Sequence, residues 1–197
     1  MEEFRSEEIL DPEAQSPKKG SGILRFLVDI LETVLLSVIL FLGINAITAR
    51  VRVDGQSMLP TFDSGEFIIV SKLAYKLGEP ERGDVVVFHL PRDPDQDYIK
   101  RIIGLPGDEV VIDDGRVFVD GALLDEPYIN AQPTYYGAWQ ISDEQFFVLG
   151  DNRNNSSDSH SWGPVPVDYV VGKAVFVYWP VSSIGVIDHP SVALAAP

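Results

Sequence analysis

Two residues of this chain, Ser57 and Lys100, could together carry out nucleophilic catalysis. A serine hydroxyl is a poor nucleophile at neutral pH and needs a base beside it. Lysine can be that base only when it is uncharged, and an apolar environment favours the uncharged form because it disfavours the ammonium. Lys100 follows Ile99 within a β-type run, and the run Asp84–Leu90 offers apolar neighbours such as Val87. The sequence therefore predicts a lysine whose pKa is lowered by burial.

Both residues also have an ordinary structural interpretation. Ser57 lies between Gly55 and Pro60, in a turn where its hydroxyl could bond to its own backbone. A single lysine in a strand, such as Lys100, is usually a solvated surface residue. Taken alone, the two residues leave both interpretations open.

Longer motifs around these residues favour the catalytic interpretation. The segments are Gly55-Gln-Ser-Met-Leu-Pro-Thr-Phe62, Tyr98-Ile-Lys-Arg-Ile-Ile-Gly-Leu-Pro-Gly-Asp108 and Gly150-Asp-Asn-Arg-Asn-Asn-Ser-Ser-Asp-Ser159. In this order they resemble the sequence boxes of type I signal peptidases, membrane-anchored serine proteases that use a lysine in place of the usual histidine. The resemblance covers about residues 50–180 and the hydrophobic segment before them. It implies a serine endopeptidase that removes N-terminal signal peptides from exported preproteins during protein secretion.

The resemblance also implies roles for individual residues. Ser57 would be the nucleophile, Lys100 the general base, and the backbone N–H of Ser57 a donor to the oxyanion. Some family members add a serine hydroxyl donor two residues before the nucleophile, where this chain has Gly55. The glycine is found in the smaller, single-anchor members of the family, so it does not count against activity, and the second donor is left unassigned.

A supporting loop follows from the third segment. Ser156 matches the family serine that hydrogen-bonds the lysine amine and orients it. Asp158 matches an acidic residue that supports this loop, with Arg101 as its expected partner. The family often has an arginine where this chain has His160, which puts one supporting ion pair in doubt. The remaining polar residues of the segment are expected to shape the loop rather than to take part in catalysis: Asp151, Asn152 and Arg153.

Substrate specificity is expected from shallow apolar pockets. By resemblance, seven residues would line these substrate-binding pockets: Val51, Val53, Met58, Phe62, Val87, Tyr98 and Ile99. Small pockets accept alanine and exclude larger side chains, which suits cleavage after an Ala-x-Ala sequence. The signal peptide would bind as an extended strand along a sheet edge, where its main chain gives affinity and its small side chains give selectivity.

The composition disfavours several other kinds of site. The net charge is −15, from 15 basic and 30 acidic residues, and residues 50–197 alone carry −11. This charge repels phosphate backbones, so no nucleic-acid partner is expected. The chain has no cysteine, which excludes disulfides and thiolate nucleophiles. Its three histidines match no zinc-ligand spacing, and we expect neither a metal nor another cofactor.

The N-terminal part of the chain predicts a membrane anchor. Residues 1–22 are mainly polar and are expected to form a flexible cytoplasmic tail, and residues 23–49 are apolar over about the length of a transmembrane helix. Three basic residues precede the apolar segment and two follow it, so the positive-inside rule slightly favours a cytoplasmic N-terminus. We therefore predict a single-pass protein of the cell membrane with its catalytic domain on the extracytoplasmic side. A buried helix of a soluble domain and a cleavable secretory signal peptide are the alternatives.

Residues 50–190 predict a mainly β domain with antiparallel sheets, followed by a C-terminal tail at 191–197. Short runs rich in valine, isoleucine and phenylalanine recur between turn signals, at Phe67–Val70, Asp84–Leu90, Tyr98–Leu105, Glu109–Ile112, Arg116–Val119, Phe146–Leu149 and Val171–Tyr178. The sequence Asp113-Asp114-Gly115 predicts a tight hairpin turn. Two aromatic groups are candidates either for the membrane interface or for ordinary packing: Tyr178-Trp179 and Tyr135-Tyr136 with Trp139.

Two other functions are consistent with parts of the sequence. Self-cleaving repressors share a Ser–Lys pair on a similar β fold, but the apolar span and the lack of any DNA-binding segment disfavour them. An inactive membrane-tethered domain that binds peptides is disfavoured because Ser57, Lys100 and Ser156 are all present.

Overall fold

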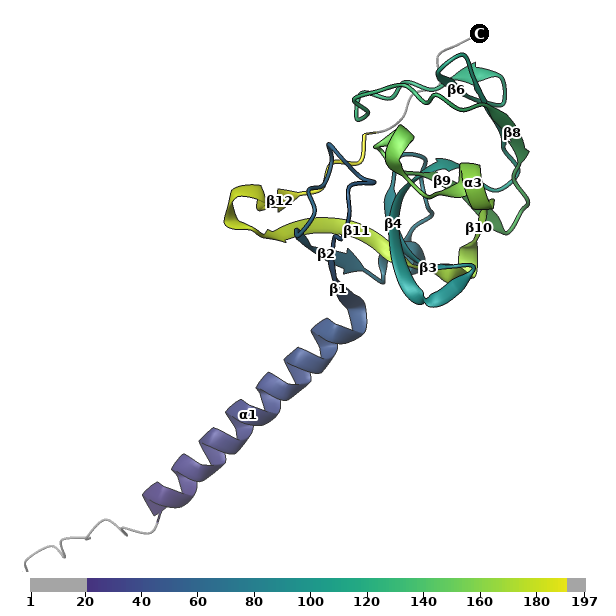
Figure 1. The fold of residues 1–197 in the computed structure, drawn as a ribbon. Helices are drawn as coiled ribbons and strands as arrows, with labels where there is room; N and C mark the ends of the chain where they lie inside the picture. Colours follow the sequence, from purple (N-terminus) through teal and green to yellow (C-terminus); the bar gives the residue numbers. More distant parts are fainter. Residues whose placement is uncertain (1–20, 191–197) are drawn as a thin grey trace, which may run out of the picture. The chain divides into compact units, whose positions relative to one another are not determined.

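The computed structural model describes residues 21–190 of the chain. The predicted C-terminal tail and all but two residues of the predicted N-terminal tail lie outside this range. The chain divides at Gly43 and Ile44 into two compact units. The first is most of a long helix, and the second is a β-rich domain (Figure 1).

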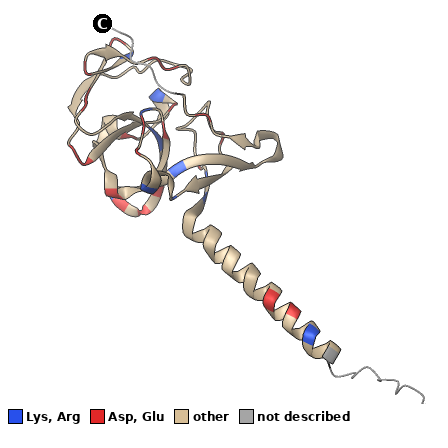
Figure 2. Cartoon of the chain, turned by 180° about the vertical axis from the view of Figure 1, so that it is seen from behind, with Lys and Arg blue, Asp and Glu red and all other residues tan. Residues whose placement is uncertain are grey.

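The long helix, α1, spans Ser21–Ile47. It begins and ends two residues earlier than the predicted span of 23–49. It ends at Ile47 because Thr48 and Ala49 already belong to β1 (Thr48–Arg52) and pair with β2 (Phe67–Ser71). Its length of about 40 Å exceeds the hydrocarbon thickness of a bilayer, and its mean hydropathy reaches 2.4. The charged residues of α1 are confined to its N-terminal half (Figure 2). No residue of the apolar window is buried against the described chain, unlike a core helix of a soluble domain.

The polar residues in the middle of α1 satisfy their hydrogen bonds within the helix. The hydroxyl of Thr33 donates to the carbonyl of Asp29, and the hydroxyl of Ser37 donates to the carbonyl of Thr33. Such local bonds allow hydroxyl side chains in an apolar environment. In length and composition, α1 can therefore cross a membrane.

All seven predicted β runs form strands: β2 (Phe67–Ser71), β3 (Val85–Leu90), β4 (Asp93–Gly104), β5 (Glu109–Asp113), β6 (Arg116–Val119), β9 (Gln145–Leu149) and β11 (Val170–Trp179). Five further strands complete the domain: β1 (Thr48–Arg52), β7 (Ala122–Leu123), β8 (Gly137–Gln140), β10 (Val165–Pro166) and β12 (Gly185–Val186). Three of these have only two residues, which is too short for an alternating pattern to show in the sequence.

The strands form two antiparallel sheets. The larger has the order β1-β2-β11-β3-β4-β9-β10, with β12 paired to β11, and the smaller has the order β7-β6-β5-β8. Short helical segments connect them: α2 (Ala74–Leu77), η1 (Arg153–Asn155), α3 (Ser159–Trp162), η2 (Val167–Tyr169) and η3 (Val181–Ser183). This architecture confirms the expected fold, a mainly antiparallel β domain after one long apolar helix.

The predicted hairpin turn connects β5 and β6. Asp113 pairs with Arg116, which leaves Asp114 and Gly115 as the two turn residues. Their φ angles are +46° and +72°, as a type I′ turn requires.

Strand β4 is a central strand and carries the predicted lysine. Between β3 and β9, its residues from Ile99 to Gly104 are all buried. Central strands are usually apolar, yet this one contains Lys100 and Arg101, with exposed fractions of 3% and 1%. Burial of a charged side chain is costly unless it is paired or neutral. These two residues therefore mark the place where the domain departs from an ordinary core.

Candidate active site

Ser57 lies in a turn that is anchored in the core. The backbone around it is held by a hydrogen bond from Phe62 N–H to Met58 O (2.9 Å), and both of these side chains are buried. Gly55 enters the turn with a φ of +93°, a conformation that is strained for any residue with a Cβ. A residue with a side-chain donor at position 55 would therefore favour a different local backbone conformation.

Lys100 projects from β4 toward this turn. Its Nζ lies 2.8 Å from Ser57 Oγ and 2.8 Å from the carbonyl oxygen of Ile99. Burial lowers the pKa of Lys100 from 10.5 to about 8, against the opposing effect of the carboxylates of Asp158 and Asp151. The structure therefore brings the two predicted residues into direct contact and makes the neutral amine accessible near neutral pH.

The loop that follows β9 holds the serine turn in place. Asn152 donates its backbone N–H to Ser57 O and its side-chain amide to Gln56 O, both at 3.0 Å. Gly150 packs so closely that a Cβ there would lie 2.4 Å from Ser57 O and 2.3 Å from Ser156 Oγ. Only glycine fits this position without moving the serine turn.

Ser156 lies beside the serine turn but does not make the expected hydrogen bond. Its hydroxyl oxygen is buried and has no partner within residues 21–190. Lys100 Nζ instead bonds to Ser57 Oγ and Ile99 O. The structure therefore brings Ser156 to the site without showing contact between its hydroxyl and the lysine amine.

Asp158 is fully buried, and its partner is not Arg101. One carboxylate oxygen accepts from Gly150 N–H (2.9 Å), and the other lies 2.6 Å from His160 Nδ1 and caps the start of α3. His160 also stacks on Tyr135, with 3.9 Å between ring centroids. The expectation of an Asp158–Arg101 pair is therefore wrong, because His160 occupies the carboxylate.

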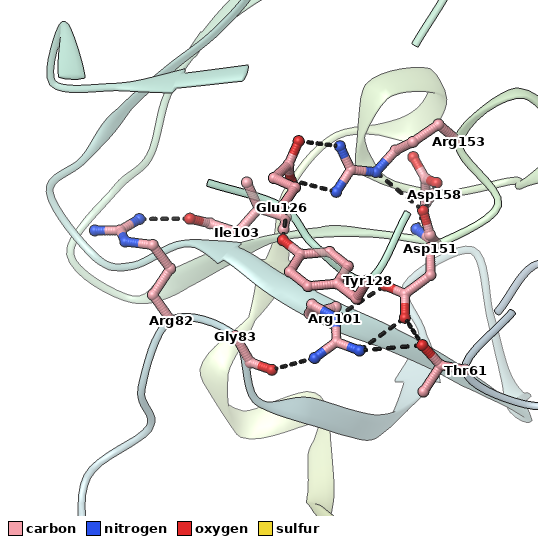
Figure 3. Close-up of polar contacts among 11 residues, drawn as sticks. Thr61, Arg82, Gly83, Arg101, Ile103, Glu126, Tyr128, Asp151, Arg153 and Asp158 are labelled. Atoms are coloured by element: carbon pink, nitrogen blue, oxygen red, sulfur yellow. Dashed lines mark hydrogen bonds and ion pairs between the residues drawn. The ribbon is translucent and has the colours of Figure 1, made fainter. Parts of the chain in front are cut away.

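Arg101 pairs instead with Asp151 (Figure 3). Two hydrogen bonds join them, from Nε to Oδ1 (2.9 Å) and from Nη2 to Oδ2 (2.7 Å), and both side chains are at most 1% exposed. Thr61, which follows the serine turn, also donates its hydroxyl to Asp151. Successive strand residues point to opposite faces, so Arg101 braces the site from the side that Lys100 does not face.

A second buried ion pair stands behind the first (Figure 3). Arg153 contacts Glu126 through both terminal nitrogens, at 2.8 and 2.5 Å. The ring of Tyr128 lies beneath Arg101, 4.1 Å from the guanidinium carbon, and its hydroxyl donates to Glu126. Sequence reasoning did not select Thr61, although it lies in the first motif, nor Glu126 and Tyr128, which lie outside the motifs. Asp151 and Arg153, which were expected to shape the loop, each form a buried ion pair.

A cleft of about 480 Å³ opens onto the Ser57–Lys100 pair. Three of the seven expected pocket residues line it: Val51, Tyr98 and Ile99. The other four are at most 3% exposed and belong to the hydrophobic core behind the site: Val53, Met58, Phe62 and Val87. Val87, for example, is fully buried in the same core cluster as Met58 and Phe62. Several polar residues that sequence reasoning did not select also line the cleft, including Gln56, Asn155 and Ser157.

The histidines have other structural roles. His89 pairs with Asp97 (2.8 Å), and His189 bonds to the backbone of Val85 and Ala174. No hydrogen bond within residues 21–190 joins a histidine to Ser57 or Lys100.

The candidate interface aromatics divide into two groups. Tyr135 stacks on His160, and Trp139 packs against Phe147. Tyr136 and Trp179, in contrast, are 85% and 54% exposed. Ordinary packing therefore accounts for Tyr135 and Trp139, but not for the exposed Tyr136 and Trp179.

The chain matches the family model described as signal peptidase, peptidase S26, over residues 27–179. It is 44% identical over 180 residues to a probable signal peptidase I-2 of Synechocystis sp., which covers 87% of this chain and 82% of that protein. It is 42% identical over 188 residues to a signal peptidase I of Leptolyngbya laminosa, with 91% of each chain covered. A signal peptidase IB of Staphylococcus aureus is 38% identical over 164 residues, or 74% of this chain and 85% of that protein.

Among solved structures, a signal peptidase I from Enterococcus faecalis is 32% identical and aligns with a TM-score of 0.45, over 49% of this chain and 97% of the other. The family match, together with the relatives, establishes the class of enzyme. The chain belongs to the type I signal peptidases of the S26 family, serine peptidases that remove signal peptides.

Proposed function

We propose that Ser57 and Lys100 are the catalytic dyad of this signal peptidase. The observation that carries the proposal is the 2.8 Å contact between Lys100 Nζ and Ser57 Oγ, with the lysine 3% exposed. In its neutral form the amine accepts the hydroxyl proton, while Ser57 Oγ attacks the carbonyl carbon of the scissile bond. The resulting ammonium returns this proton to the leaving amine, and the neutral lysine then activates the water that hydrolyses the acyl-enzyme.

The oxyanion of this reaction would bind the backbone N–H of Ser57. Among the hydrogen bonds of residues 21–190, this N–H has no acceptor, so it is free to donate to substrate. Preorganised backbone donors of this kind stabilise charge that develops in the transition state. Gly55 contributes no hydroxyl, and the φ of +93° at this position supports a hole that is built without one.

We place the signal peptide in the cleft between the end of β1 and the middle of β4. Val51 and Ile99 provide apolar walls there, and Tyr98 lies beside the lysine with its ring centroid 5.2 Å from Nζ. These walls favour alanine at the first and third positions before the scissile bond. Cleavage of a peptide library by the purified protein tests this, and a preference for leucine or phenylalanine at the first position would contradict it.

The supporting loop would act through the dyad. Asp158 fixes Gly150, and Arg101 fixes Asp151, on the loop that bonds to the serine turn. The Ser156 hydroxyl has no hydrogen-bond partner within residues 21–190. We propose that it rotates to the lysine amine once Ser57 Oγ has given up its proton and bonded to the substrate carbonyl carbon. Replacement of Ser156 by alanine should then lower kcat more than it raises KM.

For the cellular arrangement we propose that α1 anchors the protein in the cell membrane, with the N-terminus in the cytoplasm and the peptidase domain, from Thr48 to Pro190, outside. The hydropathy of α1 supports the anchor, and the basic residues before it slightly favour this orientation. Protease added to intact spheroplasts should digest the domain and spare the first twenty residues. Full protection of the domain would contradict this arrangement.

The dyad is tested by three substitutions. Ser57→Ala and Lys100→Met should each abolish cleavage of a preprotein, and Lys100→Arg should as well, because guanidinium does not lose its proton. Ser142→Ala, at an exposed serine outside the site, serves as the matched control and should keep full activity. Circular dichroism shows whether each variant is folded. Substantial cleavage by any folded dyad variant would refute the proposed mechanism.

A further inference from the structure

The segment after β2 combines features of a lipid-binding surface. It contains Lys72, the short helix α2 and an exposed apolar tip, Leu77, which is 83% exposed. Lys76 on the same helix is also exposed. An exposed leucine with two lysines shortly before it is a pattern of segments that lie in the membrane interface, where the apolar side chain inserts and the cations meet headgroup phosphates.

The structure fixes this segment at the end of the apolar helix. Lys72 N–H donates to the carbonyl of Ile47, the last residue of α1, and Lys72 Nζ lies 3.5 Å from the carbonyl of Asn45. If α1 crosses the bilayer, its C-terminal end lies where the hydrocarbon gives way to headgroups. Lys72 is therefore held at headgroup depth by its own hydrogen bonds.

The two lysines are not neutralised by the domain. Within residues 21–190, neither Lys72 nor Lys76 has a carboxylate within ion-pair distance. The neighbouring Lys173 differs, because it pairs with the buried carboxylate of Asp84 at 2.5 Å. Acidic residues outnumber basic ones by 22 to 11 in residues 50–197, so most lysines there would be expected to have a carboxylate nearby.

A cleft of about 390 Å³ lies next to these lysines. Lys72, Lys76 and Tyr75 form its polar side, and Phe146 and Val171 form an apolar side. One carboxylate, that of Asp168, is also at the cleft and leaves an excess of one positive charge. A basic cleft with an apolar wall suits a phosphate that is attached to a glycerol and acyl chains better than a free anion.

We propose that Lys72, Lys76 and Leu77 form a binding site for the headgroup of an anionic phospholipid. The site rests on the assignment of α1 as a membrane-spanning helix, but it does not depend on the catalytic dyad. The rest of the domain is acidic and is repelled by an anionic membrane surface. This site would hold the domain against that surface.

The test uses the full chain reconstituted in vesicles of phosphatidylcholine, with or without phosphatidylglycerol. Electron paramagnetic resonance of spin-labelled lipids measures the preference of the protein for phosphatidylglycerol. Lys72→Gln and Lys76→Gln should each lower this preference about fivefold. Arg92→Gln and Arg116→Gln remove exposed basic residues elsewhere in the domain and should leave it unchanged. An equal effect of the control pair, or none of the lysine pair, would overturn the proposal.

A second measurement places the segment in the membrane. Because the chain has no cysteine, a single Gly78→Cys can carry an environment-sensitive fluorophore beside Leu77, with Asp125→Cys as the control. Emission at position 78 should shift to the blue in anionic vesicles, and this shift should disappear in the double lysine variant. No blue shift, or a shift that inorganic phosphate reverses at matched ionic strength, would contradict a lipid site.

A final control separates this site from the catalytic one. The double lysine variant should cleave a short peptide in detergent at the wild-type rate, and it should resist extraction by carbonate. Loss of peptide cleavage by the folded variant would show that the lysines serve the catalytic site instead.

Discussion

The guanidinium of Arg101 and the carboxylate of Asp151 form a two-point ion pair that is closed to solvent. Arg101 follows Lys100 on β4, and Asp151 precedes Asn152, which bonds to the serine turn. The pair therefore connects the strand that carries the proposed base to the loop that positions the proposed nucleophile. Its geometry should affect both the stability and the activity of the domain.

The first prediction concerns this pair. Asp151→Asn leaves the Arg101 charge buried without a counterion, which should lower the free energy of unfolding by about 3–5 kcal/mol. Asp114→Asn is the control, because Asp114 forms an exposed pair with Arg116 and should change stability by less than about 1 kcal/mol. Urea unfolding followed by tryptophan fluorescence measures both. Similar losses of unfolding free energy in the two variants would show that the buried pair contributes no more to stability than the exposed pair.

The second prediction concerns Gly150. Gly150→Ala places a methyl group within 2.4 Å of Ser57 O, so the serine turn must move and kcat/KM should fall by at least about a hundredfold. Gly185→Ala is the control, since its nearest neighbour would be 4.0 Å away. Peptide cleavage measures both variants after their fold is verified by circular dichroism. Full activity of Gly150→Ala would mean that the contact is not maintained in solution.

The third prediction concerns the cost of the proposed base. The fold lowers the pKa of Lys100 from 10.5 to about 8 through burial, so below pH 8 the folded state bears a penalty for the ammonium that the unfolded state does not. The penalty is about 3 kcal/mol and fades as pH rises from 8 to 10.5. Lys100→Met should therefore be more stable than the wild type at pH 7, and this advantage should shrink toward pH 10. Urea unfolding at both pH values measures it, and a variant less stable at pH 7 would contradict it.

The fourth prediction separates histidine from catalysis. His189→Ala leaves Val85 N–H and Ala174 O without their partner, which should cost about 1–3 kcal/mol of stability. Cleavage by the folded variant should remain, as should cleavage by His89→Ala. His160→Ala should cause a modest loss, because it removes the partner of Asp158. A folded histidine variant without activity would require a Ser–His mechanism instead.

The sequence predicted seven of the strands, and it selected Ser57 and Lys100, which the fold brings into contact, because each of these features has a local signal. The strands alternate, the turns contain glycine, and Ser57 and Lys100 lie inside long motifs. No such local signal shows which carboxylate pairs with a buried arginine. Asp151 and Asp158 lie on one loop, and which of them reaches Arg101 depends on how η1 folds between them and how α3 folds directly after Asp158. The division of the seven pocket residues into cleft and core likewise depends on which strands cover each face.

A pH–rate profile of the wild-type protein tests the central claim most directly. The substrate should be a short Ala-x-Ala peptide whose own groups do not titrate between pH 6 and 10. If Lys100 is the base, only its neutral form is productive, so kcat/KM should rise with pH through an apparent pKa near 8 rather than 10.5. Below that value the rate should change about tenfold per pH unit. A rate that is flat across this range, or that falls as pH rises through neutrality, would show that Lys100 is not the general base.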